Sequence, residues 1–332
     1  MPGEPVLTVD DLKTVFLTRH GVIRAVNGVS FAVEAGKTLG LVGESGCGKT
    51  VTSLSLLGLI EPPGKILSGE VRLNGYNLLS LSQKQLRQVR GKEISLVFQN
   101  PMTSLNPVLT VGTQIIETII SHERVSRAEA RQRALDLLTR VGLPYPEKLM
   151  KCYPFQLSGG MRQRAMIAMA LALRPKVLIA DEPTTALDVT VQAQILKELR
   201  RLQTEFNTTI ILITHDLGVV AEMADEVAVM YAGSIVEYGG VIEVFENPGH
   251  PYTRALLRSV PHLDRKCETL EHIQGQPPSL LNIPDRCAFL PRCPVAVGEC
   301  DGPRPQLDAI TSKHMVACYR ACKVRARELQ PA

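Results

Sequence analysis

Apolar residues along this chain form short continuous runs that alternate with longer stretches of helical period. The runs occupy residues 38–42, 94–98, 177–180 and 211–213. The helical stretches include residues 51–60, 111–121 and 128–141. A strand covered on both faces of a parallel sheet is apolar throughout, so we predict that the runs are buried parallel strands. The alternation of such strands with helices indicates an α/β fold.

A glycine-rich loop separates the first apolar run from the first helical stretch. Its predicted nucleotide contacts are Gly43, Ser45, Gly46, Cys47, Gly48, Lys49, Thr50 and Val51. Glycines let successive backbone N–H groups turn toward a phosphate, and the N-terminus of the following helix favours negative charge. Lys49 would bring a positive charge to the β- and γ-phosphates, and the Thr50 hydroxyl would bind Mg²⁺. The loop therefore predicts a site for ATP and Mg²⁺.

Polar side chains stand at the ends of the other three apolar runs. Asp181 and Glu182 follow one run, and Gln99 and His215 follow the other two. We expect Asp181 to hold Mg²⁺, directly or through water, and Glu182 to act as the general base for an attacking water. His215 would bond the γ-phosphate and orient Glu182, while Gln99 would reach the metal or the water. Taken alone, Gln99 and His215 would be interpreted as a solvated glutamine and a structural histidine.

The length and the net charge of the chain limit the classes of function that it can have. The chain has 332 residues and a formal net charge of +4 at pH 7. Its basic residues do not cluster with aromatic residues, which argues against nucleic-acid binding. The sequence has no run of about 18 uncharged apolar residues, so we expect no membrane span. The N-terminus lacks the basic and apolar parts of a signal peptide, so we expect a cytoplasmic protein that contacts a membrane through partners.

Residues 157–163, Leu-Ser-Gly-Gly-Met-Arg-Gln, complete a recognisable set of motifs. With the glycine-rich loop, Gln99, the Asp181-Glu182 pair and His215, they resemble the nucleotide-binding subunit of ABC transporters. The resemblance covers about residues 5–260. It implies a P-loop NTPase core with two subdomains. One is an antiparallel β-subdomain, which the alternating segments 5–40 and 69–75 would form, and the other is a helical subdomain at about 100–174.

The same resemblance implies that two ATPase subunits act together. Ser158 is suited to cap a helix starting near Gly160, which leaves backbone N–H groups for an anion. In ABC transporters this segment meets the γ-phosphate on the opposite subunit, and the D-loop, which ends here at Asp188, lies beside it. An aromatic residue near the N-terminus usually stacks on the adenine. Phe16 is the candidate for that role, with a place in the core as the alternative.

Three further segments are similar to the ATPases of oligopeptide and dipeptide importers. They are residues 100–107, 184–192 and 249–257. The family implies a second ABC ATPase, giving a heterodimer or, in isolation, a homodimer. It also implies two integral membrane permeases, an extracytoplasmic solute-binding protein and a peripheral position at the cytoplasmic face of the membrane. Nickel and other small-solute importers share these motifs, so the cargo stays open. The two prolines of 100–107 suit a hinge or docking loop, or simply a rigid turn.

The last part of the chain, residues 261–332, is expected to be a small irregular extension. From residue 273 it is rich in Pro and Gly, and it contains Cys287, Cys293, Cys300 and Cys318. In a cytosolic protein, metal binding explains such cysteines better than disulfides do, although their spacing matches neither the short paired zinc pattern nor a ferredoxin run. Importer ATPases of the D type resemble this tail, which implies a 4Fe-4S cluster. Zinc and unligated thiols are the alternatives.

Cys47 has two interpretations within the glycine-rich loop. It neighbours Lys49 and a helix N-terminus, an environment that lowers a thiol pKa and would make the residue reactive. It is otherwise a small residue that fills the loop.

Two other functions use the same nucleotide motifs. A soluble ABC ATPase of DNA repair or translation would be expected to carry coiled-coil insertions, tandem domains or a basic face. A regulatory protein that binds ATP without turnover would not need Glu182 and His215. Both residues are intact, which favours hydrolysis.

Overall fold

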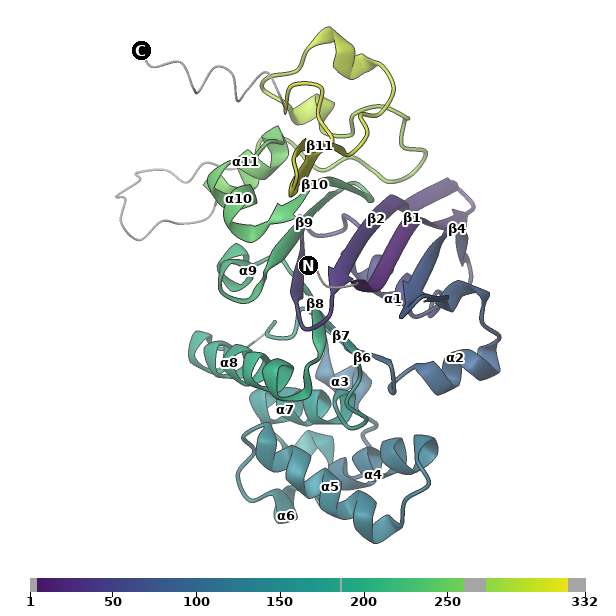
Figure 1. The fold of residues 1–332 in the computed structure, drawn as a ribbon, viewed down its shortest axis with the longest axis vertical. Helices are drawn as coiled ribbons and strands as arrows, with labels where there is room; N and C mark the ends of the chain where they lie inside the picture. The colour runs from purple at the N-terminus through teal and green to yellow at the C-terminus, as the bar shows by residue number, and fades with distance from the viewer. Residues whose placement is uncertain (1–4, 186, 260–272, 322–332) are drawn as a thin grey trace. The chain divides into compact units, whose positions relative to one another are not determined.

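The computed structural model describes residues 5–185, 187–259 and 273–321 (Figure 1). The chain contains two compact units. Unit 1 comprises the described residues within 1–7, 32–38 and 72–213. Unit 2 comprises the described residues within 8–31, 39–71 and 214–332. The predicted domain boundary near residue 260 adjoins the undescribed residues 260–272 and stays a prediction.

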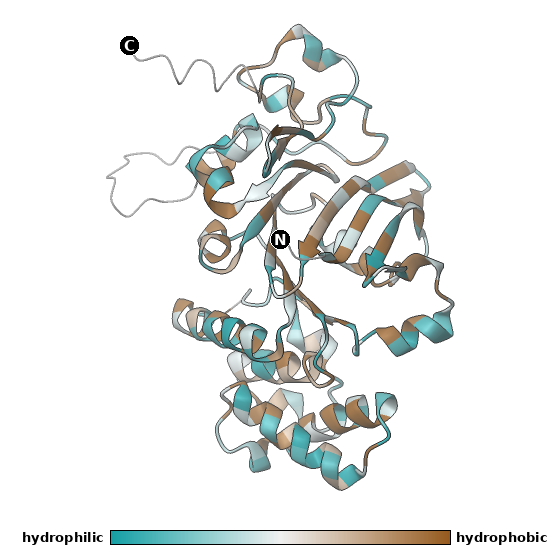
Figure 2. Cartoon of the chain, in the orientation of Figure 1, coloured by the Kyte–Doolittle hydropathy of each residue, from teal (hydrophilic) through white to brown (hydrophobic). Residues whose placement is uncertain are grey.

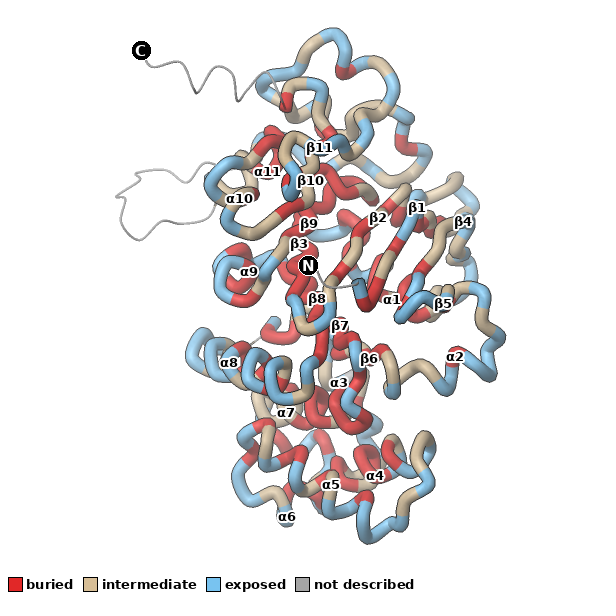
Figure 3. The backbone as a smooth tube through the Cα atoms, in the orientation of Figure 1, coloured by how far each residue is buried: buried red, intermediate tan, exposed pale blue. Residues whose placement is uncertain are grey.

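Three parallel strands pair in unit 1. They are β6 (Ile94–Val97), β7 (Val177–Asp181) and β8 (Thr209–Thr214). β7 pairs with both of the others, with Val177 opposite Ile94 on one side and opposite Thr209 on the other. Every residue of β7 and β8 is buried (Figure 3), as expected for strands covered on both faces. The predicted strands in this part of the chain are confirmed.

Unit 1 contains the two helices that the sequence predicted at residues 111–121 and 128–141. Its helices are α2 (Gln83–Val89), α3 (Pro101–Ser104), α4 (Val111–His122), α5 (Arg127–Arg140), α6 (Pro146–Leu149), α7 (Gly159–Ala170) and α8 (Val189–Phe206). Helices α4, α5 and α7 pack against one another. In α5, Ala130, Ala134, Leu137 and Leu138 form one buried face, while charged residues dominate the other (Figure 2). Ser126 caps this helix by accepting the Glu129 N–H.

The strands of unit 2 form two sets, and within each set neighbouring strands are joined by hydrogen bonds. One group comprises β1 (Pro5–Thr18), β2 (Gly21–Glu34) and β4 (Gly64–Leu73), with β1 between the other two. The short β5 (Tyr76–Asn77) of unit 1 pairs with the end of β4. The other group comprises β3 (Thr38–Val42), β9 (Glu226–Tyr231), β10 (Ser234–Gly240), β11 (Asp308–Thr311) and β12 (His314–Val316). β3 and β9 are parallel, whereas β9, β10, β12 and β11 follow one another in antiparallel pairs.

The helices of unit 2 are short. They are α1 (Lys49–Leu56), α9 (Leu217–Met223), α10 (Val241–Glu246) and α11 (Pro251–Arg258). Single turns of 3₁₀-helix occur at η1 (Leu78–Ser80) and η2 (Pro154–Gln156) in unit 1 and at η3 (Leu290–Arg292) and η4 (Gly298–Asp301) in unit 2. In the described part of the chain, no helix combines the length and apolar character needed to cross a membrane.

The C-terminal extension is more regular than the sequence suggested, because it adds two strands to a sheet. Glu237 of β10 pairs with Val316 of β12. The Glu237 carboxylate also lies 2.6 Å from Nε2 of His314, and both side chains are fully buried. The edge of β10 that does not pair with β9 supplies hydrogen-bond partners that so short a segment could not find within itself.

Candidate functional site

The predicted phosphate loop joins β3 to α1 in unit 2. Gly43 and Gly48 have φ angles of 153° and 107°. A Cβ atom at Gly43 would lie 2.2 Å from the Met230 oxygen, and one at Gly48 would lie 2.2 Å from the Ala25 oxygen. Glycine is therefore required at both positions. At Gly46, φ is 78° and a Cβ would meet nothing within 4 Å, so the tip of the loop is open. The predicted order of strand, loop and helix is confirmed.

Lys49 lies inside this loop with 6% of its surface exposed. Its Nζ donates to the carbonyl oxygens of Gly43, at 2.8 Å, and Glu44, at 3.0 Å. Ser45 and Thr50 are exposed. The loop thus holds a positive charge at its centre and presents the Thr50 hydroxyl on the first turn of α1. This donor set suits a phosphate anion with its Mg²⁺.

Cys47 is packed inside the same loop. It is 5% exposed, and its Sγ lies 2.8 Å from the position that a Cβ on Gly43 would take. The pKa of the Cys47 thiol is raised, because burial disfavours the thiolate more than nearby Lys49 favours it. The expected lowering of this pKa is therefore wrong. The position of the side chain agrees with the alternative, that Cys47 fills the loop.

Phe16 lies on β1 and is half-buried. Its ring atom Cε1 would lie 2.7 Å from a Cβ at Gly64, the first residue of β4. The ring thus packs on the backbone of a neighbouring strand. Its contact with adenine stays a prediction.

Glu182 forms the centre of a hydrogen-bonded group in unit 1. It follows β7 and Asp181, which is 3% exposed. Gln99 Nε2 donates to Glu182 Oε2 at 2.7 Å, and the Thr185 hydroxyl donates to the same oxygen at 2.8 Å. The Glu182 N–H donates to the Ile213 oxygen of β8 at 2.8 Å, with φ at 46°. The backbone is thus held in the left-handed region that non-glycine residues rarely adopt, as is common at functional sites.

The predicted signature segment begins α7. Ser158 caps this helix, and its Oγ accepts the Met161 N–H at 3.3 Å. A Cβ on Gly160 would lie 2.8 Å from Cγ1 of Val191 in α8. Asp188 caps α8 in turn by accepting the Val191 N–H at 2.9 Å. The start of α7 and the start of α8 therefore contact each other through a residue that has to be small.

The predicted site residues divide between the two units. Gln99, Ser158, Gly160, Asp181, Glu182 and Asp188 belong to unit 1, and the phosphate loop, Phe16 and His215 belong to unit 2. His215 directly follows β8 and is exposed. Within unit 1 the structure brings Gln99 to Glu182. Thr185 was not predicted from the sequence, although a hydroxyl three residues after the proposed base is a usable signal.

Two residues that contact Glu44 of the phosphate loop, Arg292 and Tyr252, were also not predicted from the sequence. Arg292 lies 2.7 Å from the Glu44 carboxylate, and the Tyr252 hydroxyl accepts the Glu44 N–H at 2.9 Å. Both residues are more than 200 positions from Glu44 along the chain. No local pattern reveals contacts at this separation.

Cys287, Cys293, Cys300 and Cys318 line one small cavity of about 10 Å³. None of them forms a disulfide. Burial raises the pKa of the Cys287 and Cys293 thiols and raises that of Cys318 to about 11. Among the described residues, no three His, Cys, Asp or Glu side chains are placed to hold a single metal ion. Four cysteine side chains on one cavity are donors of the type that both iron–sulfur and zinc sites use, and the metal itself stays a prediction.

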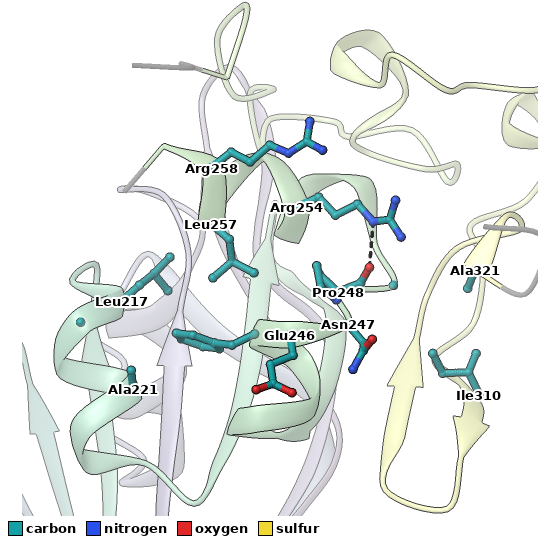
Figure 4. A pocket seen from close by; sticks show the side chains of 13 residues that line it. Leu217, Ala221, Glu246, Asn247, Pro248, Arg254, Leu257, Arg258, Ile310 and Ala321 are labelled. Carbon is teal, nitrogen blue, oxygen red and sulfur yellow. Dashed lines mark hydrogen bonds between the residues drawn. The ribbon is translucent and has the colours of Figure 1, made fainter. Parts of the chain in front are cut away.

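A larger cavity of about 520 Å³ lies elsewhere in unit 2 (Figure 4). Its wall includes Leu217 of α9, Phe245 of α10, Arg254 and Leu257 of α11, and Ile310 of β11. None of the predicted nucleotide contacts lines it. The phosphate loop is an open surface feature instead, as the exposure of Ser45, Gly46 and Thr50 shows.

Comparison with known proteins gives two family matches and close relatives. A family described as "ABC transporter" matches residues 26–185, and one described as "Oligopeptide/dipeptide transporter, C-terminal region" matches residues 236–300. The chain is 50% identical to the oligopeptide transport ATP-binding protein AppD of Bacillus subtilis, over 95% of this chain and 96% of that protein. It is also 50% identical to the oligopeptide transport ATP-binding protein OppD of Salmonella typhimurium, over 96% of this chain and 95% of that protein.

Solved structures agree on the fold. The dimeric ATP-binding cassette MJ0796, in a post-hydrolysis state bound to ADP and Pi, has a TM-score of 0.64 and 28% identity. The match covers 71% of this chain and 98% of that one. For cbiO1 of Clostridium perfringens, part of the ABC transporter complex cbiONQ, the TM-score is 0.62 and the identity 30%, over 73% of this chain and 91% of that one.

Proposed function

Because the chain belongs to the ABC transporter ATPases that carry the oligopeptide/dipeptide transporter C-terminal region, we propose that it hydrolyses ATP to power the import of di- and oligopeptides. One observation carries the proposal: the 50% identity to an oligopeptide transport ATP-binding protein extends over 95% of the chain. The match therefore includes both the ATPase core and the extension.

The phosphate loop of unit 2 binds the nucleotide phosphates in this proposal. Lys49 leaves the carbonyl oxygens of Gly43 and Glu44 to meet the β- and γ-phosphates, and the loop N–H groups turn toward the β-phosphate. Thr50, Asp181 and Gln99 would hold Mg²⁺, which neutralises charge on the phosphates. Phe16 is retained as the candidate for adenine stacking.

Glu182 acts as the general base in unit 1. The hydrogen bonds from Gln99 and Thr185 both meet Oε2, so the carboxylate is oriented before the substrate arrives. Its task is to take a proton from the water that attacks the γ-phosphorus. His215 would bond the γ-phosphate.

Two ATPase subunits enclose the nucleotides. Ser158 and Gly160 at the start of α7 would meet the γ-phosphate bound to the opposite subunit, with Asp188 beside it. The MJ0796 cassette, which has the same fold, was solved as a dimer with ADP and Pi. In the importer we propose a heterodimer with a second ABC ATPase, and for the isolated chain a homodimer.

The membrane partners are two permeases and an extracytoplasmic solute-binding protein, which place the chain at the cytoplasmic face of the membrane. Unit 1 exposes apolar side chains around α3, where Phe98, Met102 and Val108 are 42%, 50% and 74% exposed. Such a patch suits a protein contact rather than solvent. Met102 lies within residues 100–107, for which the sequence predicted a hinge or docking loop, or a rigid turn, and Phe98 and Val108 flank this segment.

The cavity lined by Cys287, Cys293, Cys300 and Cys318 is the proposed site of a 4Fe-4S cluster, with zinc as the alternative. The support is the convergence of four cysteine thiols that form no disulfide, since thiolates are the usual protein ligands of both iron–sulfur clusters and zinc. The cluster would stabilise the extension and takes no part in phosphoryl transfer.

Two experiments test the proposed function. Purified wild-type protein should hydrolyse ATP, and Glu182→Gln should lower kcat by about 100-fold or more while forming an ATP-dependent dimer. Glu129→Gln, an exposed change on α5, is the matched control.

In the second experiment, the tagged protein is isolated from its native membrane. Recovery of permeases, a second ATPase and a peptide-loaded binding protein is expected. A nickel-loaded binding protein would instead assign nickel import, and recovery of only ribosomal or nucleic-acid proteins would overturn the importer.

A further inference from the structure

We propose that Arg292 of the C-terminal extension is a positioning residue for the phosphate loop, so that the extension sets the affinity of the site for nucleotide. The inference rests on the proposed use of ATP by this loop. It concerns two residues of unit 2, Arg292 and Glu44, which no nucleotide motif includes as a pair.

The contact between them is bidentate. Arg292 Nη1 lies 2.7 Å from Glu44 Oε2, and Arg292 Nη2 lies 3.0 Å from Glu44 Oε1. Two parallel charge-assisted hydrogen bonds fix both the distance and the plane of a carboxylate. The side chain of Glu44 is therefore held in one orientation by a residue of the extension.

The Arg292 side chain is itself fixed from several directions. It is 4% exposed, and its remaining N–H groups donate to the Gln274 oxygen at 3.0 Å and the Ile273 oxygen at 3.3 Å. Nη1 also lies 3.2 Å from the Tyr231 hydroxyl. Since each donor has an acceptor and the side chain is buried, another arrangement of Arg292 would have to replace all of these hydrogen bonds.

Glu44 carries this constraint into the loop that surrounds Lys49. Its backbone N–H donates to the hydroxyl of Tyr252, which is fully buried, and its backbone oxygen accepts from Lys49 Nζ. Glu44 is thus anchored at both its side chain and its main chain. Movement of its carboxylate would shift the carbonyl that Lys49 contacts and the N–H groups that follow in the loop.

The position of Arg292 within the extension connects the loop to the cysteine cavity. Arg292 ends η3, the 3₁₀ turn that lies between Cys287 and Cys293. The Leu290 N–H donates to the Cys287 oxygen, and the Cys293 N–H donates to the Leu290 oxygen. One short turn therefore supplies both the arginine that holds the phosphate loop and the backbone next to two of the clustered thiols.

A double-mutant cycle on the full chain tests the proposal. The variants are Arg292→Gln, Glu44→Gln and the pair together, with Arg292→Lys as the conservative change. Arg286→Gln is the matched control, because Arg286 lies in the same segment and forms an exposed ion pair with Asp301. The dissociation constant of a fluorescent ATP analogue is measured without turnover, and KM and kcat are measured separately.

Arg292→Gln is expected to raise the dissociation constant about fivefold or more, with a matching rise in KM and little change in kcat. Adding Arg292→Gln to Glu44→Gln should cause little further loss, since the two residues act through one contact. Arg292→Lys should fall between Arg292→Gln and the wild type, and Arg286→Gln should match the wild type.

Unchanged nucleotide affinity in a folded Arg292→Gln protein would overturn the proposal, as would losses that simply add in the double variant. Where Arg292→Gln does not fold, wild-type affinity in both Arg292→Lys and Glu44→Gln would also overturn it. The dissociation constant is measured without hydrolysis or transport. This result therefore does not depend on whether the chain powers peptide import.

Discussion

The side chain of Gln99 lies 2.7 Å from Glu182, Nε2 to Oε2, although 83 residues separate them in the chain. The contact joins the end of β6 to the end of β7. It exists because parallel neighbouring strands end at the same edge of a sheet, and the register places Val97 opposite Ala180. A residue proposed as general base is thus oriented by the next strand of its own sheet.

Gln99→Ala should lower kcat for ATP hydrolysis by about tenfold to a hundredfold, because the variant removes one hydrogen bond to the Glu182 carboxylate. Steady-state ATPase measurements check this. Gln132→Ala, which alters an exposed glutamine on α5, is the control and should keep wild-type kcat. A Gln99→Ala protein with wild-type kcat would show that the contact does not orient the base.

Gly160→Ala should weaken ATP-dependent dimer formation, because the added Cβ would lie 2.8 Å from Val191 Cγ1. The Val191 side chain or one of the two helices has to shift, and a helix shift would move Ser158 and Asp188 at the starts of α7 and α8. We expect a several-fold loss of dimer in the Glu182→Gln background, measured by size-exclusion chromatography with ATP. Gly240→Ala meets no atom within 4 Å and should dimerise normally. Equal dimerisation of the two variants would contradict the prediction.

The sequence predicted the strands, the phosphate loop and the helices at 111–121 and 128–141, because each depends on local pattern. Continuous apolar runs indicated buried strands, and closely spaced glycines indicated a loop against another backbone. The left-handed backbone of Glu182 and the raised pKa of Cys47 could not be predicted, since both arise from residues distant in sequence. The pairing of β12 with β10 was missed for the same reason. Three residues have too little pattern to show that they are a strand.

The four cysteines that line one cavity are predicted to bind metal. Protein purified without oxygen should contain about four irons per chain and show the visible absorption of a thiolate-bound iron cluster. Cys300→Ser should abolish both signals and lower the stability of the extension. Cys152→Ser, which lies in unit 1 outside the cavity, should retain them. About one zinc per chain would assign the alternative metal, and metal-free wild-type protein would mean that the thiols are unligated.

Stability should fall as the pH drops from about 6.5 toward 4, because His250 is buried as a neutral group. Its side chain is 1% exposed and caps α11, with Nδ1 accepting the Tyr252 N–H at 3.0 Å. Burial lowers the pKa of His250 to about 4, against the opposing effect of Glu237. In the unfolded chain the pKa is about 6.5, so the unfolded state takes up this proton first. The stabilisation that depends on neutral His250 is therefore complete above about pH 6.5. It is lost as the pH falls toward 4, where the loss in the free energy of unfolding reaches about 3 kcal/mol.

His250→Asn isolates this effect, because an asparagine oxygen can cap α11 in the same way without titrating. Urea denaturation of the wild type and the variant at pH 7 and pH 5 measures the free energy of unfolding. The variant should lose less stability between the two pH values than the wild type does. The exposed His20→Asn change is the control and should keep the wild-type difference. If His250→Asn loses as much stability as the wild type over this range, another group controls the pH dependence.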